Sequence, residues 1–252
     1  MDQFQQATSP PVRLRASYLD SLTEPQEWFL EELIQDGQSW VLPSIAYGIT
    51  AGTTLVEFYV DDAVSGDASD LFGSLQKLAN IKSVLAKSYD HQLLQILRNS
   101  NWQVSETGYL FRKFTPRKIP HDPRRVFRPA SSADLSSVWQ INDGFFECVE
   151  EVADLIHAEK LWVLELDNSI IGAGVANRIV PEMDAVDLGM LIAADRRGQG
   201  HGTYVIARLA ELTIEAGLRP VCGCAEHNIA SRTVLTKAGF ESEHRLVHCE
   251  PS

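Results

Sequence analysis

Apolar residues in the first part of the chain occur in two patterns, short strand-like runs and helical spacings. The runs are rich in β-branched and aromatic residues, and Ala51-Gly52 marks a turn between two of them. They cover residues 39–42, 46–49, 53–60, 81–88 and 109–114. Apolar residues three or four positions apart predict helices over residues 71–78 and 91–98. The alternation of the two patterns predicts an α/β domain that ends near residue 114.

Local signals predict how some helices begin. Thr23 and Gln26 have the spacing of a capping box, so we predict a helix that starts there and ends at Gly37. Asp90 is placed to cap the helix predicted over residues 91–98. Residues before about Arg13 contain Gln, Ser and Pro and are expected to be loose.

A second domain is predicted after a linker. Residues 115–125 hold three prolines and four basic residues, a composition typical of a linker. Two apolar runs, 161–166 and 170–176, flank the turn Asp167-Asn168-Ser169 and predict a hairpin. Further strands are expected at residues 184–192, 219–225 and 244–248, and helices at 135–142, 150–158, 203–216 and 228–238. The predicted domains are therefore residues 1–114 and 126–252.

Composition narrows the partners and the location. The 252 residues are 44% hydrophobic and 22% charged, which suits two domains with apolar cores. The formal net charge of -12 argues against nucleic acid and anionic membranes, because both bind basic surfaces. No signal peptide opens the chain, and no run approaches the roughly 20 apolar residues of a membrane helix. We therefore expect a soluble cytoplasmic protein.

The cysteines do not indicate disulfides or a metal. Four cysteines are too few for a disulfide framework. Cys222 and Cys224 lack the wider spacing and the second ligand pair of a zinc site. Reduced thiols and no metal are expected.

The most informative stretch joins the strand at 184–192 to the helix that follows. Arg196 and Arg197 precede three alternating glycines, Gly198, Gly200 and Gly202. Glycine lets the backbone turn tightly and approach a ligand closely. The first N–H groups of the next helix have no partner within the helix and carry a partial positive charge, which favours an anion. The stretch therefore predicts a phosphate-binding loop.

Spacing separates this loop from two common nucleotide loops. A mononucleotide loop needs Lys and then Ser or Thr after the last glycine, and His201-Gly202-Thr203 has no Lys. The dinucleotide fingerprint needs a wider glycine spacing. The stretch instead resembles the pyrophosphate loop of the GNAT superfamily of acetyl-coenzyme A-dependent N-acetyltransferases. That pattern is Arg or Gln, two residues, Gly, one residue, then Gly or Ala, and Arg197, Gly200 and Gly202 occupy these positions.

A second match to the same family lies downstream. There the fifth strand is followed by Asn, a small residue three positions later, and a helix that ends in Lys-x-Gly-Phe. Asn228, Ser231, Lys237, Gly239 and Phe240 match this pattern. Asn228 is also placed to cap a helix that ends with Gly239 in the left-handed conformation.

The resemblance covers residues 126–252 well and the first part weakly. It implies an α/β (α+β) fold for residues 126–252, with a mixed, mostly antiparallel sheet flanked by helices. Residues 1–114 resemble a smaller, partial copy of the same unit. The loop at residues 61–67 contains one glycine and three carboxylates, which would repel a pyrophosphate, so this copy is expected not to bind the donor.

The resemblance also implies which residues meet acetyl-CoA, the co-substrate. Main-chain N–H groups of the fourth strand polarise the thioester carbonyl near Met190 and lie along the pantetheine arm near Ile192. The implied donor-binding residues are Met190, Leu191, Ile192, Arg197, Gly198, Gln199, Gly200, His201, Gly202, Thr203, Asn228 and Ser231. Residues 145–147 lie where the family bends its first helices over the acceptor.

The general base has more than one candidate. An amine must lose a proton before it attacks, and a carboxylate can accept that proton. Asp187, Asp184 and Glu226 are the candidates, each also explained as a solvated carboxylate. In the family, the base lies an even number of residues before the position of Ile192. Asp187 lies an odd number of residues before Ile192, so it would face the site only if a β-bulge shifted the strand. Residues 147, 150 and 151 are glutamates. They would either line an amine pocket or lie on a solvated helix face.

The proton donor for the departing thiolate differs from the family pattern. Many members carry Tyr seven residues after the Asn, where this chain has Leu235. Ser231, a water molecule or another Tyr would have to serve, or the thiolate leaves unassisted.

We therefore expect an N-acetyltransferase that transfers an acetyl group to an amine of a small molecule or protein by direct attack on the thioester. Leu235 and the poorly placed carboxylates favour one alternative, an acyl-CoA-binding regulatory module without turnover. The first domain is expected to shape the acceptor side. The alternative is a partner or homodimer interface with Trp28, Trp40 and Phe58 exposed.

Overall fold

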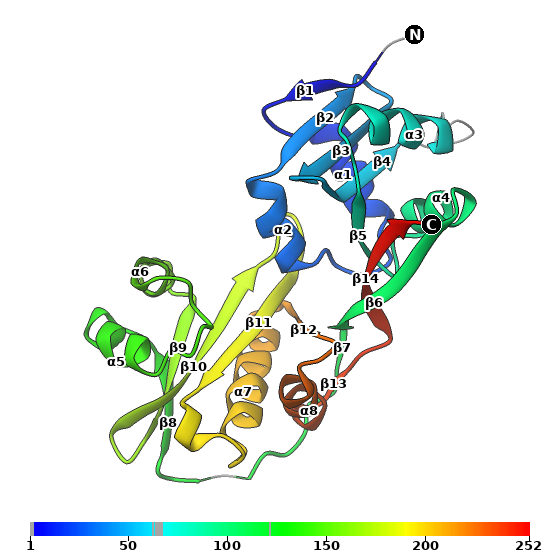
Figure 1. The fold of residues 1–252 in the computed structure, drawn as a ribbon. Coiled ribbons are helices and arrows are strands. Elements are labelled where there is room, and N and C mark those ends of the chain that lie inside the picture. The colour runs from blue at the N-terminus through cyan, green and yellow to red at the C-terminus, as the bar shows by residue number, and fades with distance from the viewer. Residues whose placement is uncertain (1–2, 62, 64–67, 121) are drawn as a thin grey trace. The chain divides into compact units, whose positions relative to one another are not determined.

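The computed structural model describes residues 3–61, 63, 68–120 and 122–252. It contains two compact units. The first unit comprises Met1–Leu110 and His244–Ser252, and the second comprises Phe111–Glu243. Each unit has a mixed, mostly antiparallel sheet flanked by helices, which confirms the predicted fold class (Figure 1). Most of the loop at residues 61–67, expected not to bind a donor, lies outside the described residues.

The first unit is built on a sheet with the strand order β1-β2-β3-β4-β5-β14-β6. β4 and β5 run parallel, and the other neighbouring strands run antiparallel. The strands are β1 (Gln5–Ala7), β2 (Gln38–Leu42), β3 (Ala46–Ala51), β4 (Thr54–Val60), β5 (Ser83–Lys87), β6 (Trp102–Phe111) and β14 (His244–Pro251). The helices are α1 (Val12–Ser21), α2 (Trp28–Gln35), α3 (Ala68–Leu78) and α4 (His91–Asn99).

Alternation along β4 fills an apolar cluster on each face of this sheet. Phe58 packs with residues of α3 and α4 on one face, and Tyr59 packs with residues of α1 and α2 on the other. Phe58 is fully buried, and Trp40 is partly buried against the same cluster. Phe58 and Trp40 are therefore core residues, and a partner or homodimer interface of the first unit would have to use other residues.

The beginning of the first unit differs from the prediction. Residues 5–7 pair with β2, and α1 starts at Val12, so this part of the segment expected to be loose forms a strand and the start of a helix. The capping box at Thr23 is also wrong, because α2 starts only at Trp28 and has no side-chain cap. Gln26 is instead fully buried among charged side chains.

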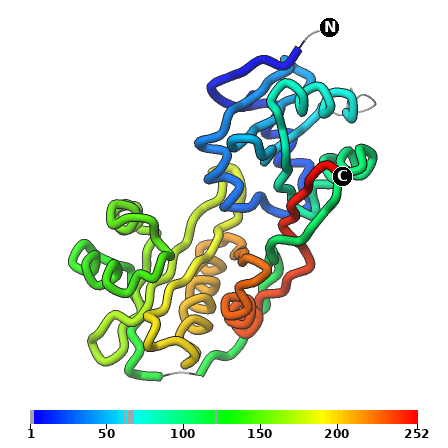
Figure 2. The backbone as a smooth tube through the Cα atoms, in the orientation of Figure 1, coloured from blue at the N-terminus to red at the C-terminus, as the bar shows by residue number. Residues whose placement is uncertain are grey.

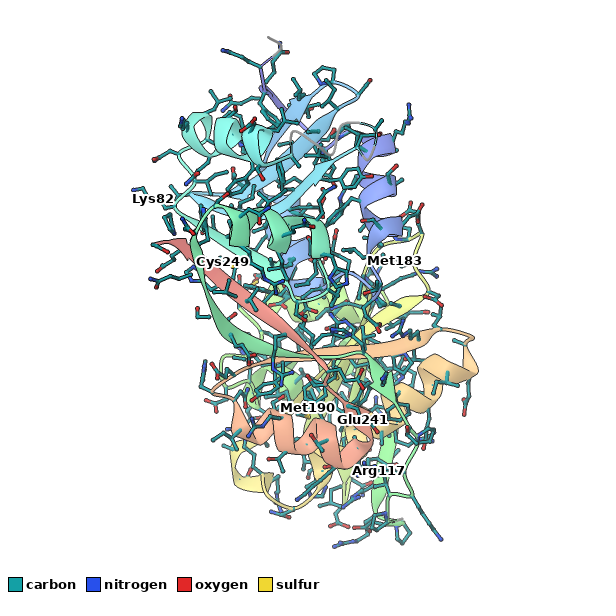
Figure 3. The ribbon with its side chains drawn as sticks, turned by 90° about the vertical axis from the view of Figure 1, so that its right-hand side faces the viewer. Lys82, Arg117, Met183, Met190, Glu241 and Cys249 are labelled. Carbon is teal, nitrogen blue, oxygen red and sulfur yellow. The ribbon has the colours of Figure 1, made fainter. Side chains whose placement is uncertain are left out.

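The last strand of the chain belongs to the first unit. β14 lies between β5 and β6 and pairs with both, and Figure 2 shows this C-terminal segment beside β6. Cys249 on β14, labelled in Figure 3, is fully buried in that unit's core. The prediction that residues 126–252 form one domain is therefore wrong for residues 244–252, whose hydrogen-bond partners lie before residue 111.

The second unit is built on a sheet with the strand order β12-β11-β10-β9-β8, in which only β11 and β12 run parallel. A separate short pair joins β7 to β13. The strands are β7 (Lys113–Phe114), β8 (Arg125–Pro129), β9 (Leu161–Leu166), β10 (Ser169–Arg178), β11 (Ala185–Ile192), β12 (Arg219–Ala225) and β13 (Phe240–Glu241). The helices are α5 (Leu135–Gln140), α6 (Val149–His157), α7 (His201–Glu215) and α8 (Ile229–Ala238).

Helices cover both faces of the second unit's sheet (Figure 1). Leu191 packs with residues of α5 and α6 on one face. On the other face, a Cβ added at Gly174 would lie 2.7 Å from Leu209 of α7. The predicted hairpin is confirmed, with Asp167 and Asn168 at φ of 51° and 62° in a two-residue turn. In the described part of the chain, no helix is long and apolar enough to cross a membrane.

Candidate active site

The two parallel strands of the second unit part halfway along their length. β11 pairs with β12 only from Ala185 to Asp187, although β11 continues to Ile192 and β12 to Ala225. On its other side β11 remains paired with β10 as far as Ile192. On the side of β11 that faces β12, the main chain of residues 188–192 is therefore not paired with that strand.

A loop rich in glycine, residues 194–203, follows β11 directly. Gly198 and Gly200 have φ of 75° and 82°, in the left-handed region that favours glycine. A Cβ added at either position would meet no atom within 4 Å, and both residues are exposed. The glycine loop therefore leaves its backbone open to solvent where α7 begins.

The electrostatics at this end of α7 favour an anion. Gly200 is the N-cap and provides no side-chain cap, and the first turn has no acidic residue. The N–H groups of that turn have no carbonyl partner within the helix and carry the positive end of its dipole. Asp195, the nearest carboxylate in sequence, lies 3.3 Å from Arg196.

Arg197 fixes the entry of the glycine loop. Its Nε donates to the carbonyl oxygen of Ile192 at 3.0 Å, and its Nη2 lies 2.9 Å from Oδ2 of Asp143. The Arg197 side chain is half exposed. It therefore ties the end of β11 to the segment between α5 and α6 and still presents a cation to solvent.

The two residues where the loop joins α7, His201 and Gly202, have different roles. His201 is 4% exposed, and neither ring nitrogen has a hydrogen-bond partner among the described residues. Burial, and then the charge of Arg125, lower the pKa of His201, so its ring is neutral at pH 7. A Cβ added at Gly202 would lie 3.0 Å from Sδ of Met190, which Figure 3 labels, so glycine lets α7 pack closely on β11.

The second motif forms the predicted helix. Oδ1 of Asn228 accepts a hydrogen bond from the Ser231 N–H at 3.0 Å and caps α8. Gly239 ends α8 with φ of 116°, as predicted. Leu235 is 2% exposed, so this position provides apolar packing and no proton donor. A side-chain hydrogen bond joins Ser231 to Cys224, whose pKa is raised by burial.

The candidate bases lie in different environments. The β10–β11 register is continuous, so the bulge that was expected to turn Asp187 toward the site is absent. Alternation puts Asp187 on the same face as Leu191, the face covered by α5 and α6. Asp184 precedes β11 and Glu226 follows β12, and both are exposed. Asp187 is therefore the candidate carboxylate on the sheet face.

The sequence patterns missed how the segment between α5 and α6 meets β11. Phe145 lies against Gly189, where an added Cβ would be 3.1 Å from Cζ of the ring. Asp143 pairs with Arg197, as described above. The available signal was Asn142-Asp143-Gly144, a tight-turn sequence directly before two aromatic residues.

In the first unit, the sheet face that α1 and α2 cover holds buried polar side chains of the unit itself. Lys87 at the end of β5 donates to the hydroxyl of Tyr18 and to Oε1 of Gln26, each at 2.6 Å. Gln26 and Tyr47 donate to the carboxylate of Glu57 on β4, at 3.0 and 2.7 Å. Glu57 and Lys87 are 0% exposed. Polar side chains of α1, β4 and β5 are thus joined by hydrogen bonds on this face.

Comparisons with known proteins agree with this geometry. Models described as acetyltransferase (GNAT) domains match residues 122–241 and, separately, residues 12–114. The chain belongs to the GNAT acetyltransferase family, with one such domain in each half. It is therefore a GNAT-type acyltransferase. The second match covers the half that was expected to be a partial copy.

Solved structures show the same fold over the whole chain. An acetyltransferase of the GNAT family from Colwellia psychrerythraea superposes with a TM-score of 0.89 at 17% identity, covering 99% of this chain and 100% of that one. A tandem GNAT protein from the clavulanic acid biosynthesis pathway gives a TM-score of 0.63 at 12% identity, with 98% and 97% covered. A GCN5-related N-acetyltransferase from Sphaerobacter thermophilus gives 0.62 at 13% identity, with 99% and 96% covered. No curated protein sequence matches the chain at a significant level.

Proposed function

We propose that the second unit transfers an acetyl group from acetyl-CoA to an amine. The observation that carries this proposal is the open glycine loop. Its two left-handed glycines lead into an uncapped helix N-terminus beside two parted parallel strands. This arrangement occurs in a chain of the GNAT acetyltransferase family, which uses acetyl-CoA.

The residues of the second unit fit the donor. Gly198 and Gly200 leave room for a pyrophosphate to approach the backbone, and the first turn of α7 offers N–H donors and contains no acidic residue. Arg197 adds a half-exposed guanidinium. His201 is buried, so we assign it a main-chain contact only. Acetyl-CoA, when bound, supplies the thioester whose acyl group is transferred.

The released strand supports the acyl-transfer step. Main-chain N–H groups between Met190 and Ile192, freed from β12, are suited to polarise the thioester carbonyl. The amine nitrogen forms a bond to the carbonyl carbon, and the carbon–sulfur bond breaks as the thiolate leaves. The nitrogen then releases its second proton, which replaces the proton that the thiolate takes up. The carboxylate of Asp187 takes the ammonium proton, directly or through water, because it lies on the sheet face that α5 and α6 cover. Glu226 is the exposed alternative.

Protonation of the thiolate is assigned to Ser231 or to solvent. Leu235 is buried and apolar, so the family's usual tyrosine has no equivalent there. Ser231 lies at the capped start of α8 and already hydrogen-bonds to Cys224. A coenzyme A thiol is acidic enough to leave with little assistance, so loss of the Ser231 hydroxyl should cost less than the roughly 10²-fold to 10⁴-fold of general acid catalysis.

Thermal unfolding with acetyl-CoA tests donor binding. The ligand should raise the melting temperature of the wild type, because binding to the folded state alone adds about 2.7 kcal/mol at one hundred times Kd. Gly200→Glu should abolish the shift, because it places a carboxylate at the helix N-terminus and a side chain at φ of 82°. Gly217→Glu is the matched control, because Gly217 has φ of 74° at the other end of α7. An unchanged melting curve at millimolar acetyl-CoA would contradict the proposal.

Buried Leu235 favours one alternative, an acyl-CoA-binding regulatory module without turnover. Both functions predict the same thermal shift. Release of free thiol above background with any amine in a panel excludes the alternative. A cytoplasmic location also stays a prediction, as does the absence of nucleic-acid and membrane partners.

A further inference from the structure

The segment between α5 and α6 holds one fixed conformation. The side chain of Asn142 accepts hydrogen bonds from the N–H groups of Phe145 and Phe146 at 3.0 Å and donates to the carbonyl oxygen of Phe146 at 2.9 Å. Gly144 takes φ of 73° in the turn. Asp143 pairs with Arg197 of the glycine loop. The backbone that carries Phe145 is therefore anchored both within the turn and to the donor side.

The ring of Phe145 is fixed on β11 and is still partly open. Its Cζ approaches Gly189, where a Cβ would lie 3.1 Å away, so glycine makes room for the ring. Phe146 meets it edge-to-face with ring centroids 4.8 Å apart and is itself buried in the core. Phe145 remains 41% exposed, although Val175 and Leu191 on this face are buried. An exposed ring held in this way is suited to contact a ligand.

Charge near this ring favours a cationic ligand. Asp187 lies two residues before Gly189 on the same strand face, so the Cα atoms of these two residues are about 7 Å apart along β11. Glu147, two residues after Phe145, is exposed as well. Carboxylates and an aromatic face both attract ammonium groups, and the ring also packs against hydrocarbon. An amine that carries an apolar substituent would satisfy both groups at once.

We propose that Phe145 is a specificity-determining residue that selects primary amines bearing an aryl or alkyl group. The hydrocarbon packs on the Phe145 ring, and the ammonium group lies toward Asp187. Gly189 sets the position of the ring. This inference rests on the proposed acetyl transfer and adds the chemical class of the acceptor.

The ratio of kcat/KM for two probes, 2-phenylethylamine and methylamine, tests this inference in the full chain with acetyl-CoA. The wild type should favour 2-phenylethylamine by at least about tenfold, which is about 1.4 kcal/mol of differential binding. Phe145→Ala should reduce the ratio about tenfold, mainly by raising KM for 2-phenylethylamine, and should leave KM for acetyl-CoA unchanged. Phe145→Tyr should keep the ratio, because the ring remains. General damage to the chemistry affects both probes equally and leaves the ratio unchanged.

Ile214→Ala is the matched control. Ile214 is 44% exposed, close to the 41% of Phe145, but lies near the C-terminal end of α7 and far from the glycine loop. It should leave both the ratio and the rate unchanged. Calorimetry on protein saturated with coenzyme A should show weaker binding of 2-phenylethylamine to Phe145→Ala by the same factor.

The outcomes separate this inference from the proposed function. Turnover of both amines with equal ratios in wild type and Phe145→Ala overturns the role of Phe145 and leaves acetyl transfer intact. A wild type that prefers methylamine also overturns it. Absence of amine-dependent thiol release with every probe overturns both proposals.

Discussion

Among the glycines that the structure describes, Gly239 has the closest neighbouring atom to an added Cβ. It ends α8 at φ of 116°, and its carbonyl oxygen accepts a hydrogen bond from the Thr115 N–H at 2.9 Å. A Cβ at Gly239 would lie only 2.1 Å from the carbonyl oxygen of Thr115. The left-handed conformation and the close approach of a second backbone both require glycine.

Replacement of Gly239 by alanine should therefore destabilise the second unit. We expect a loss of about 2 kcal/mol or more, because the substitution adds left-handed strain and a steric clash. Gly73→Ala is the control, because Gly73 lies inside α3 and an added Cβ meets nothing within 4 Å. That substitution should stabilise the protein by up to about 1 kcal/mol through helix propensity. Denaturant unfolding measures both, and equal effects would contradict this account.

Residue-scale predictions succeeded where both partners are close in sequence. Asn228 and Asp90 cap their helices through residues three positions later, so the sequence shows both partners. Gln26 was assigned to a local capping box, but its side chain bonds Glu57 and Lys87, 31 and 61 residues away. No local pattern indicates partners at that separation.

At the scale of elements, buried charges join the strands and helices of the first unit. Arg15 on α1 lies 3.1 Å from Glu57 on β4 and also pairs with Glu31 on α2. Tyr18 on α1 donates to Asp90, the cap of α4, at 2.8 Å. Burial lowers the pKa of Lys87, and the charges of Asp90 and Glu57 oppose that shift. These groups hold α1, α2 and α4 to the sheet as one connected network.

Lys87→Met should break this network. We expect a loss of about 3–5 kcal/mol in the free energy of unfolding, because Tyr18 and Gln26 lose their buried hydrogen-bond donor. The charge of Asp90 also loses a neighbouring cation. Lys113→Met is the control, because Lys113 pairs with Glu243 where both side chains are more than half exposed, and it should cost no more than about 1 kcal/mol. Acetyl-CoA should still raise the melting temperature of Lys87→Met. A loss similar to that of the control would show that the network contributes little.

Element-scale prediction from the sequence depended on how local each feature is. The glycine loop and the start of α7 follow from glycine spacing and a helical pattern, both visible within about fifteen residues. Asp187 shares the sheet face of Leu191 because the ladder with β10 is regular. The β-bulge that we expected to turn Asp187 toward the site is absent. The contact between Phe145 and Gly189 joins segments 44 residues apart, and no periodic pattern indicates it.

At the scale of the whole molecule, two separate segments of the chain form the first unit, and one continuous segment forms the second. β14 completes the first unit between β5 and β6, although it follows the second unit in sequence. Within the second unit, β7 pairs with β13, and Phe114 contacts Phe240 with ring centroids 4.6 Å apart. Each unit therefore depends on a strand that lies beyond the domain boundary expected from the sequence.

Fragments cut at the boundaries expected from the sequence should not fold cooperatively. Residues 126–252 would lack β7 and would leave β14 without β5 and β6, and residues 1–114 would lack β14. The full chain should show a cooperative thermal transition by circular dichroism, and each fragment a broad one. A fragment of residues 126–252 that melts cooperatively and is stabilised by acetyl-CoA would contradict this description.

The sequence indicated two related domains but not this strand arrangement. Strand positions follow from apolar runs, and residues 244–248 were correctly predicted as a strand. Strand pairing depends on contacts such as Leu246 with Lys87, which are far apart in sequence. Short polar runs such as residues 5–7 gave no strand signal, because main-chain hydrogen bonds rather than apolar side chains define β1.

Release of free thiol from acetyl-CoA by the full chain, measured across a panel of primary amines, tests the central claim most directly. We predict thiol release above background with at least one amine, its loss in Gly200→Glu, and its retention in Gly217→Glu. Thiol release that no amine stimulates, in wild-type protein shown to bind acetyl-CoA, would contradict the assignment of acetyl transfer to the second unit.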